Sequence, residues 1–326
     1  MKMLSTLVAR RISFVIMAGT AVGMAMPAIA QSYPERPITV IVPFGPGGTT
    51  DLTARAFQKA FADNNLLAQP LVVANVTGGA VGSVGARQVL SSAPDGYTFL
   101  LHHLGMMSAG AVGTQDFSYT DFEPVAGTTD FCSVVVVAAD SPYNSLSDML
   151  TDAAAHPDTI LYGANLGGNI HIAGLMLEAL QPGADFRIVQ IGAEVDNVTA
   201  IKGGIINATT LSTGTYTRYK AEGLKALADL AELREPTVPE VPTAKEQGYD
   251  MTFCVAHWWF APKGTPPEVI DTFAQALKAA MDDPTLRAYF EERSTLLTFE
   301  SGPEFKADLD ATYEVIAPIA VRAAEQ

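Results

Sequence analysis

Two glycine-rich turns carry the residue types in this sequence that could bind a ligand. The first, Phe44-Gly45-Pro46-Gly47-Gly48-Thr49-Thr50, follows an apolar run at 38–43 and precedes a helical pattern that starts at Asp51. A turn between a strand and a helix presents unpaired backbone N–H groups at the positive end of the helix dipole, and this arrangement suits an anion. The glycines can also serve only a tight turn with Asp51 as helix cap, so this turn alone leaves the function open.

The second turn, Gly163-Ala164-Asn165-Leu166-Gly167-Gly168-Asn169, has the same form in the middle of the chain. Ligands of open α/β sheets bind at the carboxyl ends of the strands, so two such turns from two lobes predict a cleft between them. The pair favours a small anion, a carboxylate, held by main-chain amides and by Thr49 or Thr50. A dinucleotide is not expected, because Thr50 stands where the third glycine of G-x-G-x-x-G belongs.

Short apolar runs alternate with helical patterns along the chain, which predicts an α/β fold with mostly parallel sheets. The expected strands lie at 38–43, 71–76, 97–101, 133–138, 160–163, 187–191, 205–211, 224–228 and 296–299. The expected helices lie at 51–65, 81–91, 145–157, 169–180, 193–202, 266–281, 284–293 and from 303 onward. The extended segments 133–138 and 253–261 are the candidate crossovers between the lobes, and Pro318 should kink or interrupt the last helix.

Composition narrows the class of protein. A length of 326 residues favours two domains, and 48% apolar with 17% charged residues excludes a disordered chain. A net charge of −15 argues against nucleic acid or an anionic membrane as the main partner. The two cysteines, Cys132 and Cys254, can form a disulfide or remain as two buried thiols. No Cys/His cluster has zinc spacing, so we expect neither a metal nor a cofactor.

The first thirty residues have the three parts of a secretory signal peptide. Lys2, Arg10 and Arg11 precede an uncharged, mostly apolar run at 12–26, and Pro27-Ala28-Ile29-Ala30 supplies an A-x-A ending. The run is shorter than the roughly 20 apolar residues that span a bilayer. We therefore expect cleavage after Ala30 and a periplasmic location.

Several ordered motifs resemble one known family over nearly the whole mature chain. They are Tyr33-Pro34-Glu35-Arg36-Pro37-Ile38, the segment from Val42 to Arg55, Ala93-Pro94-Asp95-Gly96-Tyr97-Thr98, Val238-Pro239-Glu240-Val241-Pro242-Thr243 and Phe260-Ala261-Pro262-Lys263-Gly264-Thr265-Pro266. The sequence is similar to the periplasmic substrate-binding proteins of tripartite tricarboxylate transporters, the Bug or TctC family. Such proteins are two-lobed clamshells that close on a carboxylated metabolite and hand it to a membrane permease.

The resemblance implies a monomeric two-lobed periplasmic-binding-protein (Venus flytrap) fold and no catalysis. Residues 31–131 and 256–326 would form lobe I and residues 132–255 lobe II. The implied ligand-binding residues come from both lobes and the edge of their cleft: Phe44, Gly45, Gly47, Gly48, Thr49, Thr50, His102, His103, Leu104, Gly163, Ala164, Asn165, Gly168, Asn169, Gln190 and Leu211. The implied partners are a small carboxylate and permease subunits, with no nucleic acid.

The sequence departs from the family pattern at three places. His102, His103 and Leu104 replace small polar residues at the cleft edge, where the imidazoles either contact the ligand and titrate near pH 6 to 7 or pack between loops. Gln190 lies where the family often has a Val-Pro-Tyr-Lys-Gly segment, and Leu211 where it often has Phe-Asp-Asn. An ammonium group would then find less acidic surroundings, which favours a mono- or dicarboxylate without an amine, an aromatic one included.

Two other functions stay open at this point. An exported enzyme is less favoured, because the chain has no G-x-S-x-G elbow, metal motif or Cys/His nucleophile arrangement. An exported carboxylate receptor that signals to a partner would have the same cleft as a transport receptor.

Overall fold

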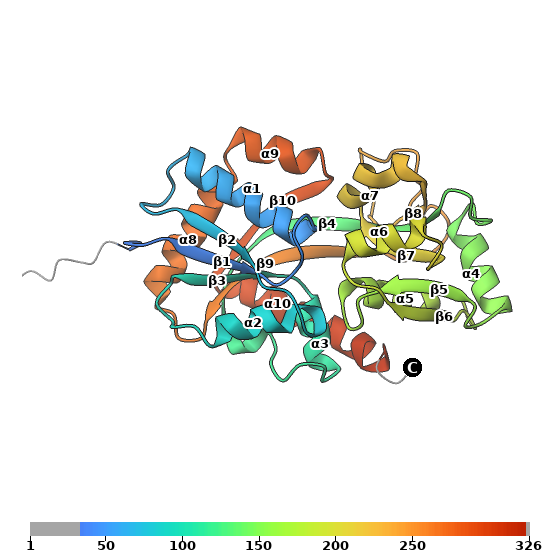
Figure 1. The fold of residues 1–326 in the computed structure, drawn as a ribbon, viewed down its shortest axis with the longest axis horizontal. Coiled ribbons are helices and arrows are strands. Elements are labelled where there is room, and N and C mark those ends of the chain that lie inside the picture. Colours follow the sequence, from blue (N-terminus) through green and yellow to red (C-terminus); the bar gives the residue numbers. More distant parts are fainter. Residues whose placement is uncertain (1–32, 324–326) are drawn as a thin grey trace, which may run out of the picture. The chain divides into compact units, whose positions relative to one another are not determined.

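Strand–helix units build the fold, as the alternation of apolar runs predicts (Figure 1). The computed structural model describes residues 33–323, and all of them belong to one unit. The expected signal peptide lies outside the described residues. The strands are β1 (Ile38–Val42), β2 (Leu71–Asn75), β3 (Thr98–His102), β4 (Phe122–Ala138), β5 (Ile160–Ala164), β6 (Phe186–Gln190), β7 (Ala208–Ser212), β8 (Leu224–Asp229), β9 (Cys254–Pro262) and β10 (Thr295–Ser301).

Helices connect most of these strands. They are α1 (Thr49–Asp63), α2 (Ser83–Leu90), α3 (Gly105–Ala111), α4 (Leu146–Ala155), α5 (Asn169–Ala179), α6 (Glu194–Lys202), α7 (Thr213–Tyr219), α8 (Pro267–Ala280), α9 (Pro284–Glu291) and α10 (Gly302–Ala323). Sequence patterning did not predict α3 or α7, which have seven residues each. The last helix includes Pro318 and continues past it to Ala323.

The strands follow the order β2-β1-β3-β9-β4-β7-β5-β6, with β10 and β8 also paired to β4. β1 runs parallel to β2 and β3, and β5 runs parallel to β6 and β7. We call the elements around β1–β3 the first lobe and those around β5–β7 the second lobe; they lie at the left and right of Figure 1. The fold is therefore α/β and two-lobed: β1–β3 are parallel in the first lobe and β5–β7 in the second, and β4 joins the lobes by antiparallel pairing with β7, β8, β9 and β10.

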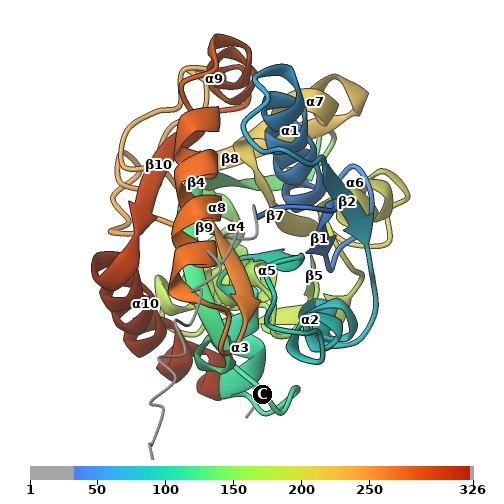
Figure 2. The same ribbon diagram turned by 90° about the vertical axis from the view of Figure 1, so that its left-hand side faces the viewer.

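Aromatic side chains fill the core of the first lobe. Phe57 of α1 packs edge-on to Trp259 of β9, and Phe99 of β3 stacks on Phe273 of α8 with ring centroids 3.9 Å apart. Figure 2 looks at this lobe from outside, with α8 in front of the sheet. Both tryptophans of the chain, Trp258 and Trp259, are buried on β9, so packing fixes their positions.

The connection between the lobes is longer than sequence patterning predicts. The expected strand at 133–138 is only the end of β4, which begins at Phe122. Its first part pairs with β9 and β10 and its second part with β7 and β8. Register shifts lie at Pro124/Ala126 and Gly127/Thr129. These irregularities break the period-2 pattern, which explains why the first half of the strand was missed.

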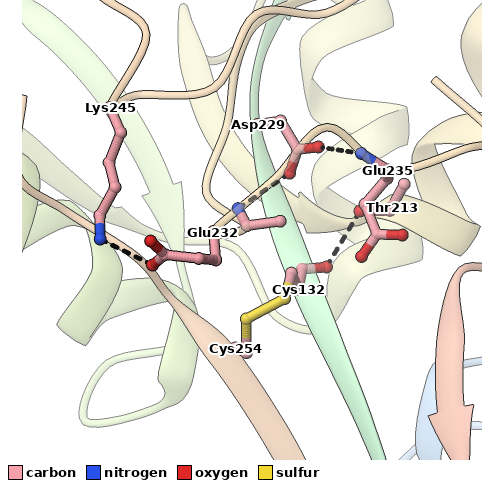
Figure 3. The surroundings of a disulfide bond; sticks show 8 residues. Cys132, Thr213, Asp229, Glu232, Glu235, Lys245 and Cys254 are labelled. Atoms are coloured by element: carbon pink, nitrogen blue, oxygen red, sulfur yellow. Dashed lines mark hydrogen bonds and ion pairs between the residues drawn. A yellow bond between two sulfur atoms is a disulfide. The ribbon is translucent and has the colours of Figure 1, made fainter. Parts of the chain in front are cut away.

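A disulfide joins the two crossover strands. Cys132 of β4 and Cys254 of β9 are direct neighbours in the sheet register and are bonded to each other (Figure 3). Thr213 at the start of α7 donates a hydrogen bond to the Cys132 carbonyl at 3.2 Å. The bridge spans 122 positions of sequence, a stretch that contains all of β5 to β8. It thus fastens together the two ends of the stretch that builds the second lobe.

We expect loss of this disulfide to destabilise the protein. Because the cross-link closes a long loop, the double variant Cys132→Ser/Cys254→Ser should lower the free energy of unfolding by about 2–5 kcal/mol. Urea unfolding of the oxidised protein and of the variant measures the difference. Adding a reductant during the titration should lower the urea midpoint of the parent protein and leave that of the variant unchanged. Equal stability of the variant and of the parent protein without reductant would contradict the prediction.

Candidate functional site

The two glycine-rich turns predicted from the sequence meet at one cavity of about 60 Å³ between the lobes. The lining of this interlobe cavity consists of Phe44, Gly48, Thr49, Thr50, Val81, His103, Phe131, Asn165, Asn169, Ile170, Gly192, Ala193 and Glu194. The β1–α1, β5–α5 and β6–α6 turns all contribute. Three carboxyl ends of parallel strands thus converge here, as they do at ligand sites of open α/β sheets.

The β1–α1 turn holds the start of α1 open toward the cavity. Gly48 is the N-cap and receives no side-chain cap. Its N–H donates to the Gly45 carbonyl at 3.4 Å, and the Gly47 N–H donates to Asp51 at 2.9 Å. Burial would raise the pKa of Asp51, but hydrogen bonds from Arg55, Gly47 and Asn75 outweigh burial and keep that pKa below its usual value. The ionised Asp51 therefore shapes the turn, and the first-turn amides of α1 are left for a ligand.

The β5–α5 turn repeats this design in the second lobe. Gly168 is an N-cap without a side-chain cap, and its N–H donates to the Asn165 carbonyl at 2.8 Å. Gln190 accepts from the Leu166 N–H at 2.7 Å, while His171 accepts from the Gly167 N–H at 3.0 Å. Side chains behind the turn thus fix its shape without occupying the amides at the start of α5.

Direct hydrogen bonds join the lobes beside the cavity. The Thr49 hydroxyl donates to Glu194 Oε2 at 2.8 Å, and Arg218 Nη1 donates to the Gly47 carbonyl at 3.3 Å. A third contact between the lobes is the hydrogen bond that the Ser108 hydroxyl of α3 donates to the Gly167 carbonyl. Because both glycine-rich turns take part, the contacts that bring the lobes together also set the spacing of the two helix N-termini.

Histidines near the cavity are buried and neutral. His103 lines the cavity and stacks on Phe44 with ring centroids 4.8 Å apart, whereas His102 bonds the Val81 carbonyl behind it. Burial lowers the pKa of His102 to about 4 and that of His103 well below 6.5. Titration of these groups near pH 6 to 7, which the sequence left open, is therefore not expected, and neither imidazole supplies a cation to the site.

The structure brings some of the sequence-predicted site residues to the cavity and not others. Those in its lining are Phe44, Gly48, Thr49, Thr50, His103, Asn165 and Asn169. Those outside its lining are Gly45, Gly47, His102, Leu104, Gly163, Ala164, Gly168, Gln190 and Leu211.

The residues outside the lining have structural reasons for their positions. Leu104 and Leu211 are buried in apolar clusters. Gly163 permits close packing, because a Cβ there would lie 2.3 Å from Asn197 Oδ1. Gly45, Gly47, Gly168 and Gln190 shape the turns through the hydrogen bonds described above.

The main residue that sequence reasoning missed is Glu194, at the start of α6. The expectation of less acidic surroundings for an ammonium group did not take account of Glu194, which lines the cavity and is only 9% exposed. The sequence predicted a helix at 193–202 after a strand at 187–191. The rule that ligands bind where a strand of an open α/β sheet ends and a helix begins therefore covered this turn as well. Ile170, Gly192 and Ala193 lie in or next to the same strand-to-helix turns, whereas Val81 and Phe131 lacked a comparable signal.

Comparison with known families identifies the kind of receptor. Residues 53–297 match the model of the tripartite tricarboxylate transporter family receptor, TctC. The chain belongs to this family. Its members are solute receptors, which confirms the prediction of a binding protein rather than an enzyme. Protein BugT of Bordetella pertussis is 33% identical over 256 residues, which cover 76% of this chain and 77% of BugT.

Solved structures of similar proteins have the same fold. The periplasmic binding protein BugD is 29% identical, with a TM-score of 0.81 over 89% of this chain and 98% of its own. MatC of Rhodopseudomonas palustris, solved with bound malate, is 28% identical, with a TM-score of 0.77 over 90% of this chain and 99% of its own. In the part of the chain described here, no helix has the length and apolar character to cross a membrane.

We expect a bulky side chain at Gly48 to weaken ligand binding without unfolding the protein. A Cβ at Gly48 would meet only the Gly45 carbonyl at 3.5 Å, so the fold tolerates a side chain, but Gly48→Leu would fill space where an anion approaches the α1 amides. Loss of one or two anion–amide hydrogen bonds predicts at least about tenfold weaker binding by calorimetry.

Gly45→Leu is the matched control for this prediction. Gly45 lies in the same turn, outside the cavity lining, and a Cβ there meets nothing within 4 Å. The control should bind as the parent protein does. Equal affinity of the Gly48 variant and the parent would remove the β1–α1 turn from the binding site.

Proposed function

We propose that this chain captures a small carboxylate in the interlobe cavity and presents it to the permease of a tripartite tricarboxylate-type transporter. The observation that carries the proposal is the position of two uncapped helix N-termini, those of α1 and α5, on the lining of one cavity. Each aligned N-terminus stabilises a nearby anion by about 0.3–1 kcal/mol when exposed and by more when partly buried.

The chemistry of the lining supports a carboxylate. Asn165 and Asn169 add amide donors and Thr50 adds a hydroxyl group, all without charge, whereas the Thr49 hydroxyl donates to Glu194. The Thr50 hydroxyl is positioned by His257 Nε2 at 3.2 Å. Apolar side chains, among them Phe131, cover much of the remaining wall, which also includes His103 and Glu194, and they suit a short carbon skeleton. A volume of about 60 Å³ holds a few water-sized groups, which favours a ligand smaller than an aromatic acid in this arrangement of the lobes.

The domain boundaries given above are part of this proposal. Residues 31–131 with 256–326, and residues 132–255, would move as two bodies about the paired crossover strands. The Cys132–Cys254 bridge lies at this boundary and would keep the two strands in register while the lobes open and close.

Export and transport complete the proposal. We infer that residues 1–30 direct the chain to the periplasm and that it works there as a monomer. The family of tripartite tricarboxylate transporter receptors supports both the location and the permease as partner. MatC, a relative solved with malate, supports a carboxylate as cargo.

A carboxylate panel tests the proposal. Binding to the folded state alone stabilises by about 2.7 kcal/mol at a ligand concentration 100 times the dissociation constant. At least one small carboxylate should therefore raise the melting temperature by several degrees, in a concentration-dependent way. Calorimetry should give one site per chain, and chromatography should recover the ligand unchanged.

Two results would contradict the proposed function. One is a panel of short mono- and dicarboxylates that leaves the melting temperature unchanged at millimolar concentration. The other is conversion of a bound carboxylate into a product, because a transport receptor releases what it binds.

A further inference from the structure

Glu194 places a buried carboxylate in a cavity whose other features attract anions. It is the first residue of α6, lines the cavity and is hydrogen-bonded to Thr49, the first residue of α1. Its Oε2 accepts hydrogen bonds from the hydroxyl groups of Thr49, Ser212 and Thr215. Its Oε1 accepts from the Ser212 backbone N–H at 2.6 Å. The side chain is therefore held in one orientation by two lobes.

These partners leave the negative charge of Glu194 without a balancing cation. Three hydroxyl groups and one backbone amide are all neutral donors. No lysine or arginine occurs among the described residues that line the cavity. The nearby His103 does not supply one either, because burial keeps its pKa well below 6.5. A buried carboxylate in such surroundings attracts a positive group and repels a second anion.

Glu194 also keeps hydrogen-bonding capacity for a ligand. An ionised carboxylate offers about four acceptor positions, two on each oxygen. Within the described structure Oε1 receives one donor, so one of its acceptor positions is available. An ammonium group carries three donors and a positive charge, and it satisfies this oxygen better than a hydroxyl group does.

We propose that Glu194 determines specificity: the site selects a small zwitterion with one carboxylate and one ammonium group, and it discriminates against dicarboxylates. This inference rests on the proposed function, because the ligand carboxylate is assigned to the amides of the α1 and α5 turns. The ammonium group then contacts Glu194 within a cavity of about 60 Å³, which admits a skeleton of only a few carbon atoms. A second ligand carboxylate would meet Glu194 with no cation between them.

Five acids of matched size test the inference by calorimetry: propionate, lactate, alanine, β-alanine and malonate. The parent protein should bind alanine or β-alanine at least about tenfold more tightly than propionate or malonate, as expected for one charge-assisted hydrogen bond. Lactate carries a hydroxyl group where alanine carries an ammonium group. It should bind more weakly than whichever of alanine and β-alanine the parent protein binds more tightly.

The Glu194→Gln variant should reverse this order. The amide retains the size of the side chain and accepts from Ser212, while the surrounding hydroxyl groups can rotate to accept from its NH₂. Binding of the preferred amino acid should weaken at least about tenfold, and malonate should bind as tightly as before or more tightly. Glu232→Gln is the matched control, because it removes the same charge from a side chain that is 70% exposed and pairs with Lys245.

The results of these experiments distinguish failure of the inference about Glu194 from failure of the proposed function. If Glu194→Gln weakens the binding of all five acids equally, Glu194 is a structural residue and the inference is overturned. Tighter binding of malonate than of either amino acid by the parent protein would also overturn it. Failure of all five acids to bind overturns it too. If other carboxylates still bind, the proposed function stands; if no carboxylate binds, both fail.

Discussion

Unpaired backbone amides at the start of α1 and α5 are the feature on which the rest of this structure depends. Both helices begin after a strand that ends at the interlobe cavity, and neither N-cap residue, Gly48 or Gly168, brings a side chain to satisfy those amides. The surrounding hydrogen bonds from Asp51, Gln190 and His171 hold the turns from behind. The fold thus keeps polar groups unsatisfied where a ligand can satisfy them.

Charge in and around the cavity is arranged to favour binding by dipoles rather than by ion pairs. Asp51 is balanced by Arg55 at 3.0 Å, and His103 and His257 are kept neutral by burial. Glu194 remains as a charged group in the cavity lining. Under the proposed function a ligand carboxylate is held without a basic residue, and we propose that selectivity among carboxylates depends on Glu194, the acidic side chain of the lining that contacts the β1–α1 turn through Thr49.

The strand–helix alternation and both glycine-rich turns were predictable because periodicity, glycine and capping residues act locally. The first half of β4 was not, since Pro124 and Gly127 disrupt its pattern and only pairing with β9 and β10 makes it a strand. Leu211 lies outside the cavity lining, because alternation along β7 places it in an apolar cluster. Glu194 follows a strand and begins a helix, so the rule used for the two glycine-rich turns covered its position, but its contact with Thr49, 145 positions away, appears only in the fold.

A crystal structure of the protein with a bound carboxylate tests the central claim most directly. The account predicts that the carboxylate oxygen atoms lie within hydrogen-bond distance of backbone nitrogens in the first turns of both α1 and α5, between the two lobes. A carboxylate paired instead with a lysine or arginine side chain, or bound on one lobe away from the β1–α1 and β5–α5 turns, would contradict it.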